Sequence, residues 1–353
     1  MIKGLNKFCM ACGMLGLLGS IPLQAQQAVA LKQVSMKRWN IPPANYSGIT
    51  PLGGDRYAVV SDKEASDGFY EFVIRLNLKT GEIEHVQREG FRTSETAVST
   101  PERDCEGVAY FPERGSVFIS GEGDQQILKY DSLGIPTGRG LAIPDMFGKG
   151  RIQPNYGFEA LGYSDVTALF WTTTENALKA DRETGDEMPF LRLQSFGKDL
   201  QALESYGYRM ELRRTRTPGR IFVYGVSAMT ALPDGRVLVL EREANIPKHY
   251  IGSRVDCRLF VVNPSLTTPL SGNVSRDEVP DSCLLPKTEL WHGVTRLNLT
   301  RRSFANYEGM CLGPRLNDGR QTLLLLNDSQ AGYKKGPISL KDYIQVLLLP
   351  EGF

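Results

Sequence analysis

Short apolar runs separated by polar turns dominate the chain, and stretches with helical periodicity are rare. The runs 57–60, 117–119 and 237–240 each follow a turn that contains Gly, Asp or Pro. Apolar runs joined by such turns are typical of β-hairpins, because Gly tolerates the positive φ that tight turns require. The pattern therefore predicts an all-β fold.

One pattern recurs along the chain: a small or acidic residue, then Gly or Ala, an apolar strand, a turn, and a second strand that ends on an acid. The five copies begin at Ser47, Glu106, Glu159, Ser227 and Glu308. This spacing fits the four-stranded blades of a single β-propeller with insertions. We predict five blades, and a sixth blade before Glu308 or a β-sandwich are the alternatives.

The fifth copy lacks strands. Only Tyr343–Leu349 follows its hairpin, whereas Val29–Trp39 has no assigned partner. We expect Val29–Trp39 to complete the last blade and close the ring, which would leave no long exposed edge. Two insertions, 179–187 and 264–286, are expected either to form a lid over the channel mouth or to lie at the edge of the propeller.

The N-terminus resembles a secretory signal, with Lys3 and Lys7 before an apolar run from Phe8 to Leu23. Glycines and a proline interrupt this run, so a stable membrane span is not expected. We divide the chain into a signal peptide, 1–25, and a propeller domain, 26–353. The resulting hypothesis is a periplasmic or secreted bacterial protein.

The charge balance argues against nucleic acid as a partner. Two of the 41 basic residues and no acid lie in residues 1–25, which leaves 39 basic residues against 40 acids. Nucleic-acid binding needs a basic footprint. We expect a monomer that acts on a small anionic or ester substrate.

Four cysteines follow residue 25, and an even number is compatible with disulfides in an exported protein. Cys257 and Cys283 flank one excursion, and we predict a disulfide between them. Cys105 and Cys311 begin blades that are not expected to be neighbours, and they are predicted to be buried thiols. A zinc site made of Cys and His is not favoured.

Carboxylates recur at the strand ends. In a propeller, the start of the first strand and the end of the second lie on the same face of the ring. Glu106, Glu159 and Glu308 are therefore expected at the channel mouth. The outer rim is expected to carry Asp62, Glu122, Glu175, Glu241 and Asp328.

Such a cluster needs compensation, because like charges repel and burial disfavours ionisation. A hard cation such as Ca²⁺ is one solution, with Glu106, Glu159, Glu308 and Asp62 as its ligands. A shared proton is another, and it would make the three inner glutamates an acid/base set. Hydrogen bonds to backbone N–H groups of neighbouring blades are the structural alternative. Substrate binding is assigned to the neighbouring residues Lys63, Arg103, Arg242 and Asp328.

Several enzyme motifs are missing from the sequence. It contains no nucleophile elbow, no P-loop and no dinucleotide-binding glycine pattern, so no organic cofactor is expected. His292 is interpreted as a strand or loop residue rather than as a base.

Four segments together resemble the phytase-like family, whose members are labelled "esterase-like activity of phytase". They are Asp104–Val108, Gly157–Leu161, Ala231–Arg242 and Asn306–Met310. The resemblance extends from about Tyr46 to Leu349 and implies an exported bacterial β-propeller that hydrolyses phosphate or other esters.

Three functions are consistent with these features. The first is a metal-assisted hydrolase of phosphate or other esters, with its site at the channel mouth. The second is a non-catalytic propeller that binds a small anion, a sugar or a partner protein there. The third is a calcium-dependent lactonase-type enzyme with the same acids around one ion.

Overall fold

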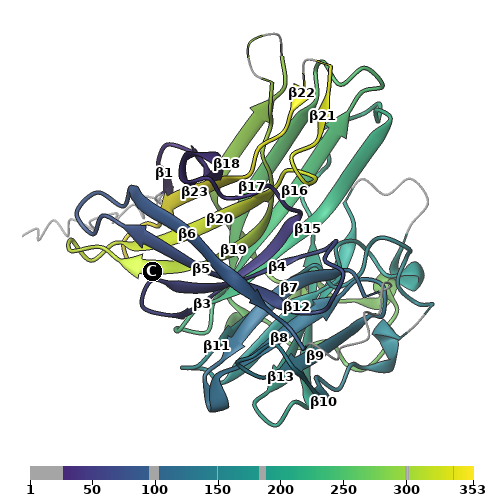
Figure 1. Cartoon of the computed structure of the whole chain (residues 1–353). Helices are drawn as coiled ribbons and strands as arrows, with labels where there is room; N and C mark the ends of the chain where they lie inside the picture. Colours follow the sequence, from purple (N-terminus) through teal and green to yellow (C-terminus); the bar gives the residue numbers. More distant parts are fainter. Residues whose placement is uncertain are drawn as a thin grey trace, which may run out of the picture.

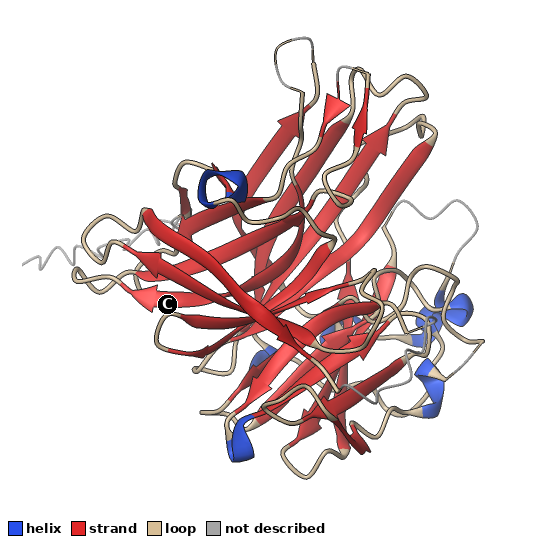
Figure 2. Cartoon of the chain, in the orientation of Figure 1, coloured by secondary structure: helices blue, strands red, loops and turns tan. Residues whose placement is uncertain are grey.

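The computed structural model describes residues 27–94, 103–148, 150–182, 188–298, 300, 302–336 and 338–353. Strands make up most of this part of the chain, and the helical segments are short 3₁₀ turns at its periphery (Figure 2). The strands form five antiparallel blades arranged in a ring (Figure 1). The structure thus confirms an all-β propeller with five blades.

Each blade is a four-stranded sheet, and blade 5 carries one additional short strand, β2. The strands are, for blade 1, β3 (Tyr46–Gly53), β4 (Arg56–Ser61), β5 (Phe69–Leu76) and β6 (Ile83–Arg92); for blade 2, β7 (Cys105–Phe111), β8 (Ser116–Gly121), β9 (Gln126–Tyr130) and β10 (Pro136–Gly140); for blade 3, β11 (Ala160–Ser164), β12 (Leu169–Thr173), β13 (Phe190–Gly197) and β14 (Ala202–Arg209); for blade 4, β15 (Ile221–Ala231), β16 (Val237–Ile246), β17 (Arg254–Val262) and β18 (Lys287–Arg296); and for blade 5, β19 (Asn306–Arg315), β20 (Gln321–Asp328), β23 (Tyr343–Leu348), β1 (Val29–Ala30) and β2 (Val34–Ser35).

The innermost strands β3, β7, β11, β15 and β19 contact one another in this order, and β19 contacts β3 to close the ring. Closure depends on the N-terminal segment, as predicted: β1 and β2 both pair antiparallel with β23. The expected strand is shorter than Val29–Trp39, because a 3₁₀ turn, η1 (Met36–Trp39), follows Ser35. The first and last described segments of the chain therefore share one sheet.

Apolar side chains fill the interfaces between adjacent blades. Leu238 and Leu240 of blade 4, for example, lie in one fully buried cluster with Leu323 and Leu325 of blade 5. Near the ring centre the packing requires glycine at some positions. A Cβ on Gly48 would lie 2.3 Å from the carbonyl oxygen of Glu106 in the next blade, so the close approach of β3 to β7 excludes any side chain there.

Blade 4 contains the longest strands, and they extend beyond the ring on the side where β16 ends and β17 begins (Figure 1). The short hairpin of β21 (Lys334–Lys335) and β22 (Ile338–Ser339) lies beside these strand ends. Because four residues separate Arg242 from the end of β16, the strand continues for about 13 Å past that side chain.

The insertion 264–286 covers the outer strand of blade 3. It consists largely of loop with the turns η5 (Pro264–Leu266), η6 (Arg276–Glu278) and η7 (Asp281–Cys283). Backbone N–H groups of Leu270 and Leu285 donate to the carbonyl oxygens of Ser205 and Gly207 in β14. The insertion therefore lies at the edge of the propeller, where it protects an exposed sheet edge. Of the insertion 179–187, the described part contains η4 (Lys179–Asp181), and Asp181 forms an ion pair with Arg192 of blade 3.

The predicted Cys257–Cys283 disulfide is wrong in this structure, because both residues are free, buried thiols. Cys257 lies in β17 and packs in the core between blades 4 and 5. Cys283 lies in η7 and packs with Phe190 and Leu270 against blade 3. The two sulfurs are separated because the insertion folds away from the blade that contains Cys257. Cys105 and Cys311 are buried thiols, as predicted.

The predicted signal peptide, residues 1–25, lies outside the described residues. Among the residues that are described, no helix is both long and apolar enough to cross a membrane.

Candidate functional site

β-Bulges position the residues that begin the repeats. In four blades the register between the two inner strands shifts at this point, and the residues left out of register are Ser47, Glu106 with Gly107, Ser227 and Glu308. In blade 3, Glu159 directly precedes β11. A bulge removes a residue from the ladder and re-aims its side chain, which is why bulges are common beside functional sites. Here they occur at the channel mouth in successive blades.

The second strands contribute one rim residue each. Each rim residue pairs with a residue on the preceding chain segment, and that residue stands two positions before the start of the repeat. The five pairs are Asn45–Asp62, Asp104–Glu122, Gly157–Glu175, Gly225–Arg242 and Asn306–Asp328. Four rim positions therefore carry an acid, and the fifth carries Arg242. This corrects the expectation that Glu241 lies on the rim, since adjacent residues of a strand point to opposite faces.

Repeats that begin with serine and repeats that begin with glutamate differ in the hydrogen bonds that this first side chain forms. Ser47 Oγ donates to the carbonyl oxygen of Cys105 at 2.7 Å, and Ser227 Oγ donates to that of Tyr307 at 2.9 Å. Both serines thus connect neighbouring blades. The carboxylates of Glu106 and Glu159 receive no side-chain or backbone hydrogen bond from any residue that the structure describes, although they are only 7% and 8% exposed.

The acidic side of the mouth lies at the junctions of blades 1, 2 and 3. One carboxylate oxygen each from Glu106, Glu122 and Glu159 lies within 4.8 Å of the other two. Burial raises the pKa of Glu106 and of Glu159 well above the usual range. The charge of Glu159 raises the Glu106 pKa further. The charges of Glu175 and Glu122 do the same for Glu159. Without a cation these groups would take up protons.

A second group of acids shares Glu106. Oxygens of Asp62, Asp104 and Glu106 also lie within 4.8 Å of one another. Lys63 partly neutralises this group, because its Nζ lies 2.7 Å from Asp104 Oδ1 and 3.1 Å from Asp62 Oδ2. The Lys63 side chain is 60% exposed, so it can move away without a large cost.

The opposite side of the mouth contains a buried cation. Arg242 forms ion pairs with Glu175 and with Glu308, and its side chain is 5% exposed. Its Nη1 also lies 3.3 Å from Asn306 Oδ1, and the Asn306 amide donates to Glu308 Oε1 at 2.6 Å. Burial still raises the pKa of Glu308 to about 7, although Arg242 lowers it. Glu308 therefore lies against Arg242 rather than in either group of converging acids.

Two other predicted substrate-binding residues lie in closed local networks. Arg103 is 1% exposed, pairs with Asp124 and Asp67, and donates to the carbonyl oxygen of Ile119. Asp328 accepts hydrogen bonds from the backbone and the side chain of Gln330. Burial raises the Asp328 pKa well above its usual range, and the charge of Glu308 raises it further. Lys63 and Arg242 thus remain the rim cations nearest to the converging acids.

The residues on the acidic side fit a hard divalent cation. Their donor atoms are all carboxylate oxygens, which suit Ca²⁺ or Mg²⁺ better than zinc. Neither of the two buried carboxylates forms an ion pair with a described residue, although the charge of Arg242 lowers the pKa of Glu159 in part. With one oxygen from each, three carboxylates supply fewer than the six to eight oxygen ligands that Ca²⁺ takes, so water or substrate would have to complete its coordination.

A family model described as "Phytase-like: Esterase-like activity of phytase" matches residues 41–330. The chain belongs to the phytase-like family. This result confirms the resemblance found in the sequence, and the matched region includes the mouth residues from Asp62 to Asp328.

Solved structures with similar folds share little sequence with this phytase-like propeller. A streptogramin B lyase is 13% identical with a TM-score of 0.36, over 92% of this chain and 98% of that one. A luciferin-regenerating enzyme is 10% identical with a TM-score of 0.40, over 91% and 96%. A virginiamycin B lyase from Staphylococcus aureus is 11% identical with a TM-score of 0.37, over 90% and 99%. A search of curated protein sequences gave no match.

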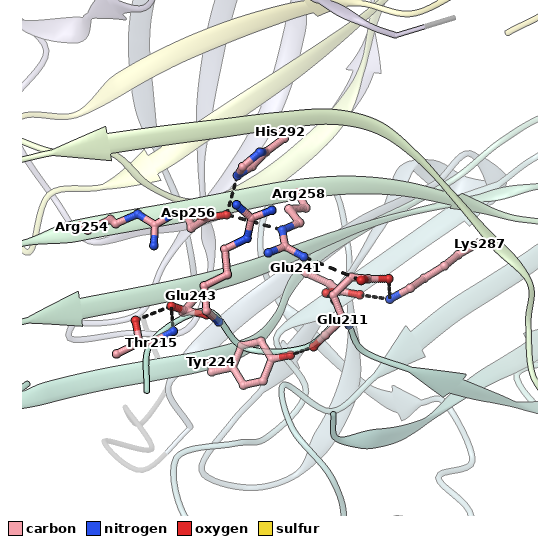
Figure 3. Close-up of polar contacts among 11 residues, drawn as sticks. Glu211, Thr215, Tyr224, Glu241, Glu243, Arg254, Asp256, Arg258, Lys287 and His292 are labelled. Carbon is pink, nitrogen blue, oxygen red and sulfur yellow. Dashed lines mark hydrogen bonds and ion pairs between the residues drawn. The ribbon is translucent and has the colours of Figure 1, made fainter. Parts of the chain in front are cut away.

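Glu241 belongs to a polar network on one face of blade 4 (Figure 3). Because adjacent residues of a strand point to opposite faces, the Arg242 side chain lies on the other face. It accepts from Lys287 Nζ and Tyr208 Oη, both at 2.6 Å, and from the backbone N–H of Glu211 at 3.0 Å. Two residues on, Glu243 accepts from the backbone N–H groups of Arg214 and Thr215, at 2.6 and 3.0 Å. These carboxylates fasten the linker between blades 3 and 4 to the sheet.

His292 is part of the same network. It lies in β18, and its Nε2 is 2.8 Å from Asp256 Oδ1 (Figure 3). Asp256 also pairs with Arg254, and it lies 3.6 Å from Arg258 Nε. A cavity lined by Asp256 and Arg258, together with Glu241 and Glu243, holds about 10 Å³, room for one water molecule at most. His292 is therefore a strand residue in an ion-pair network, as interpreted from the sequence.

Sequence reasoning did not assign Glu122 and Asp104 as candidate ligands. The signal for both was present: Glu122 was recognised as a strand-end acid, and Asp104 precedes Glu106 by two residues. Asp104 has a positive φ of 51°, and this irregular backbone conformation, which places it in the acidic group, was not visible in the strand pattern.

Proposed function

We propose that the chain is an exported, metal-assisted hydrolase of phosphate or other esters that acts at the channel mouth. The observation that carries this proposal is the pair of buried carboxylates, Glu106 and Glu159, which converge with Glu122 and lack hydrogen-bond donors among the described residues. Structural carboxylates at this depth are normally paired or hydrogen-bonded. Strongly perturbed, unsatisfied acids in one place are typical of a functional site.

Glu106, Glu122 and Glu159 are the proposed ligands of a divalent cation, with Ca²⁺ as the first candidate. Asp62 and Asp104 form an adjoining group through the shared Glu106. A cation held there would polarise an ester oxygen and lower the pKa of a water molecule. The chain itself supplies the carboxylates, fixes their positions through the β-bulge in β7, and limits access from bulk water.

Glu308 is the proposed acid/base group. Its pKa of about 7 lies near the usual operating pH, where a carboxyl group can both accept and donate a proton. Arg242 holds it in place, together with Asn306. The same guanidinium would stabilise negative charge that develops on the substrate.

Lys63 is the proposed contact for the anionic part of the substrate, because its side chain is exposed at the acidic side of the mouth. Asp328 and Arg103 would support the site from their closed networks rather than touch the substrate. The signal-like segment 1–25 supports export, and we propose that the mature protein is monomeric and either periplasmic or secreted.

The test compares chelator-treated protein with protein in excess CaCl₂. We expect calcium to raise the unfolding temperature and to activate turnover of at least one class among aryl phosphates, aryl esters and lactones. Glu106→Gln and Glu159→Gln should each abolish the calcium-dependent shift and lower kcat/KM by about 100-fold or more. Glu113→Gln, an exposed acid in the turn before β8, is the control and should behave like wild type.

Full activity in both glutamine variants would contradict the proposed site. A calcium-dependent shift without turnover on any substrate would favour the non-catalytic binding propeller. Turnover confined to the lactones would favour the lactonase-type enzyme.

A further inference from the structure

The projecting end of blade 4 has an unusual charge composition. Five segments, 212–223, 244–255, 295–298, 302–307 and 329–336, meet there, and we call them the basic tip. Together they contain ten of the 41 lysines and arginines of the chain and none of its 40 aspartates and glutamates. The chain as a whole has a formal net charge of only +1, so positive charge is concentrated at one end of one blade.

Hydrogen bonds and a ring contact hold these segments together. The backbone N–H of Gly219 donates to Asn245 Oδ1 at 2.6 Å, and that of Gly252 donates to the carbonyl oxygen of Leu297 at 3.1 Å. The hydroxyl groups of Tyr250 and Tyr333 lie 2.8 Å apart, and their rings stack. The basic tip is therefore one surface formed by the ends of the long blade 4 strands and the β21–β22 hairpin (Figure 1).

Most of this positive charge faces solvent. Six exposed cations, Arg214, Arg216, Arg220, Lys248, Lys334 and Lys335, form no ion pair with any residue that the structure describes. Arg254 is an exception, because it pairs with Asp256 below the tip. A surface with several unpaired cations attracts anions over a Debye length, about 8 Å at physiological ionic strength.

Exposed aliphatic side chains lie among the cations. Leu212 is 51% exposed, Ile221 is 45% exposed and Ile251 is 44% exposed. Two of these three flank arginines directly: Leu212 precedes Arg213, and Ile221 follows Arg220. Cations together with exposed apolar side chains suit the surface of an anionic bilayer, where head groups meet the charges and the apolar groups enter the interface.

We propose that the basic tip docks onto the anionic phospholipid head groups of a membrane surface. The charge complementarity would also suit a soluble polyanion, but a polyanion gains nothing from the exposed aliphatic side chains. The tip also projects as loops and strand ends, whereas proteins that track a single-stranded polyanion use a positively charged groove. The proposal rests on this surface alone and does not require the proposed hydrolase.

Docking would fix the orientation of the propeller. The basic tip lies on the same side of the ring as Arg242 and Glu308, and β16 rises about 13 Å from Arg242 to the tip. The channel mouth would therefore face the bilayer across a short gap, and molecules at the head-group level would be nearest to it.

Vesicle flotation tests this proposal with the full chain. We expect binding to vesicles of one part phosphatidylglycerol and two parts phosphatidylcholine, no binding to phosphatidylcholine alone, and release at high salt. Because each cation near an anionic surface contributes about 1 kcal/mol, the charge reversal R216E/R220E should weaken binding on the order of 100-fold. The matched control K79E/K198E changes the same number of charges at turns on the opposite side of the ring and should bind like wild type.

A second variant separates lipid from polymer. Ile221→Ser with Ile251→Ser should weaken vesicle binding by about tenfold, since buried aliphatic surface is lost, and should leave retention on heparin unchanged. Equal losses in the tip and control charge variants would overturn the proposal. Retention on heparin without vesicle binding would overturn it in favour of a soluble polyanion.

Discussion

The two sides of the channel mouth both contain carboxylates, but they balance the negative charge differently. On one side Arg242 pairs with Glu175 and Glu308 inside the protein. On the other side Glu106 and Glu159 are equally buried and have no such partner among the described residues. The first side contains its own cation, whereas the second requires protons or a cation from solution.

This difference shows why the number of acidic residues in a region does not by itself locate a functional site. Repeated acids arise from the repeated hairpin, and many of them are satisfied by their neighbours, as Glu241 and Glu243 are by the linker between blades 3 and 4. The informative residues are those that remain unsatisfied despite burial.

Loss of Arg242, the buried cation of the channel mouth, should have the largest effect on the free energy of unfolding. Arg242→Met would leave Glu175 and Glu308 buried without an ion-pair partner, which should lower the free energy of unfolding by about 3–5 kcal/mol. Urea denaturation measures this change. Combining R242M with E175Q and E308Q should restore most of the stability, because no uncompensated charge remains. A single variant as stable as wild type would show that Arg242 does not balance these acids.

Removing one carboxylate from either side of the mouth should change the free energy of unfolding in opposite directions. In chelator, Glu175→Gln should lower the unfolding free energy by about 1–3 kcal/mol, because a charge-assisted hydrogen bond to Arg242 is lost. Glu159→Gln should instead raise it by up to about 1 kcal/mol, because like-charge repulsion is relieved. Urea denaturation of both variants measures the two changes side by side. Destabilisation by both substitutions would mean that the two sides are balanced in the same way.

The cation-free protein should lose stability as the pH rises. Burial raises the folded-state pKa of Glu308 to about 7 and those of Glu106 and Glu159 well above their usual range. The folded state therefore binds more protons than the unfolded state above pH 4.5, so stability falls between pH 5 and pH 8. We expect the unfolding temperature in chelator to fall by about 2 °C or more over this window. Saturating calcium should flatten the trend, and a rise with pH in chelator would contradict the predicted protonation.

The smallest effect is expected at Lys63, which is exposed and close to both acidic groups. Lys63→Met removes a competing cation from Asp62 and Asp104, so calcium affinity should rise, by less than about tenfold because solvent screens the charge. Calorimetric titration measures this affinity. A weaker affinity in the variant would indicate that Lys63 helps to organise the acids instead of competing for them.

Much of the fold was accessible from the sequence, because each blade repeats the same local pattern. The five repeat starts, the hairpins and the use of the N-terminal segment to complete blade 5 all follow from apolar runs and turn residues. The placement of Glu106, Glu159 and Glu308 on one face also follows, since it depends only on strand direction.

The details that decide the chemistry were not accessible in the same way. Whether Glu241 or Arg242 lies on the rim depends on strand register. A shift of one residue would move every side chain of the strand to the other face of the sheet. The separation of Cys257 from Cys283 depends on where a long insertion folds, and its packing against blade 3 has no local signal in the sequence. The missing donors around Glu106 are likewise a property of the assembled ring.

The pairing of Val29 with Leu348 has a consequence for the timing of assembly. The ribosome makes β1 before any other strand of the propeller and β23 after all the others. Blades 1 to 4 are therefore synthesised before β1 and β23 can pair. The ring is thus open throughout synthesis, and its final step joins the two ends of the propeller domain. A chain cut short before Tyr343 would have four finished blades and no means of locking them into a circle.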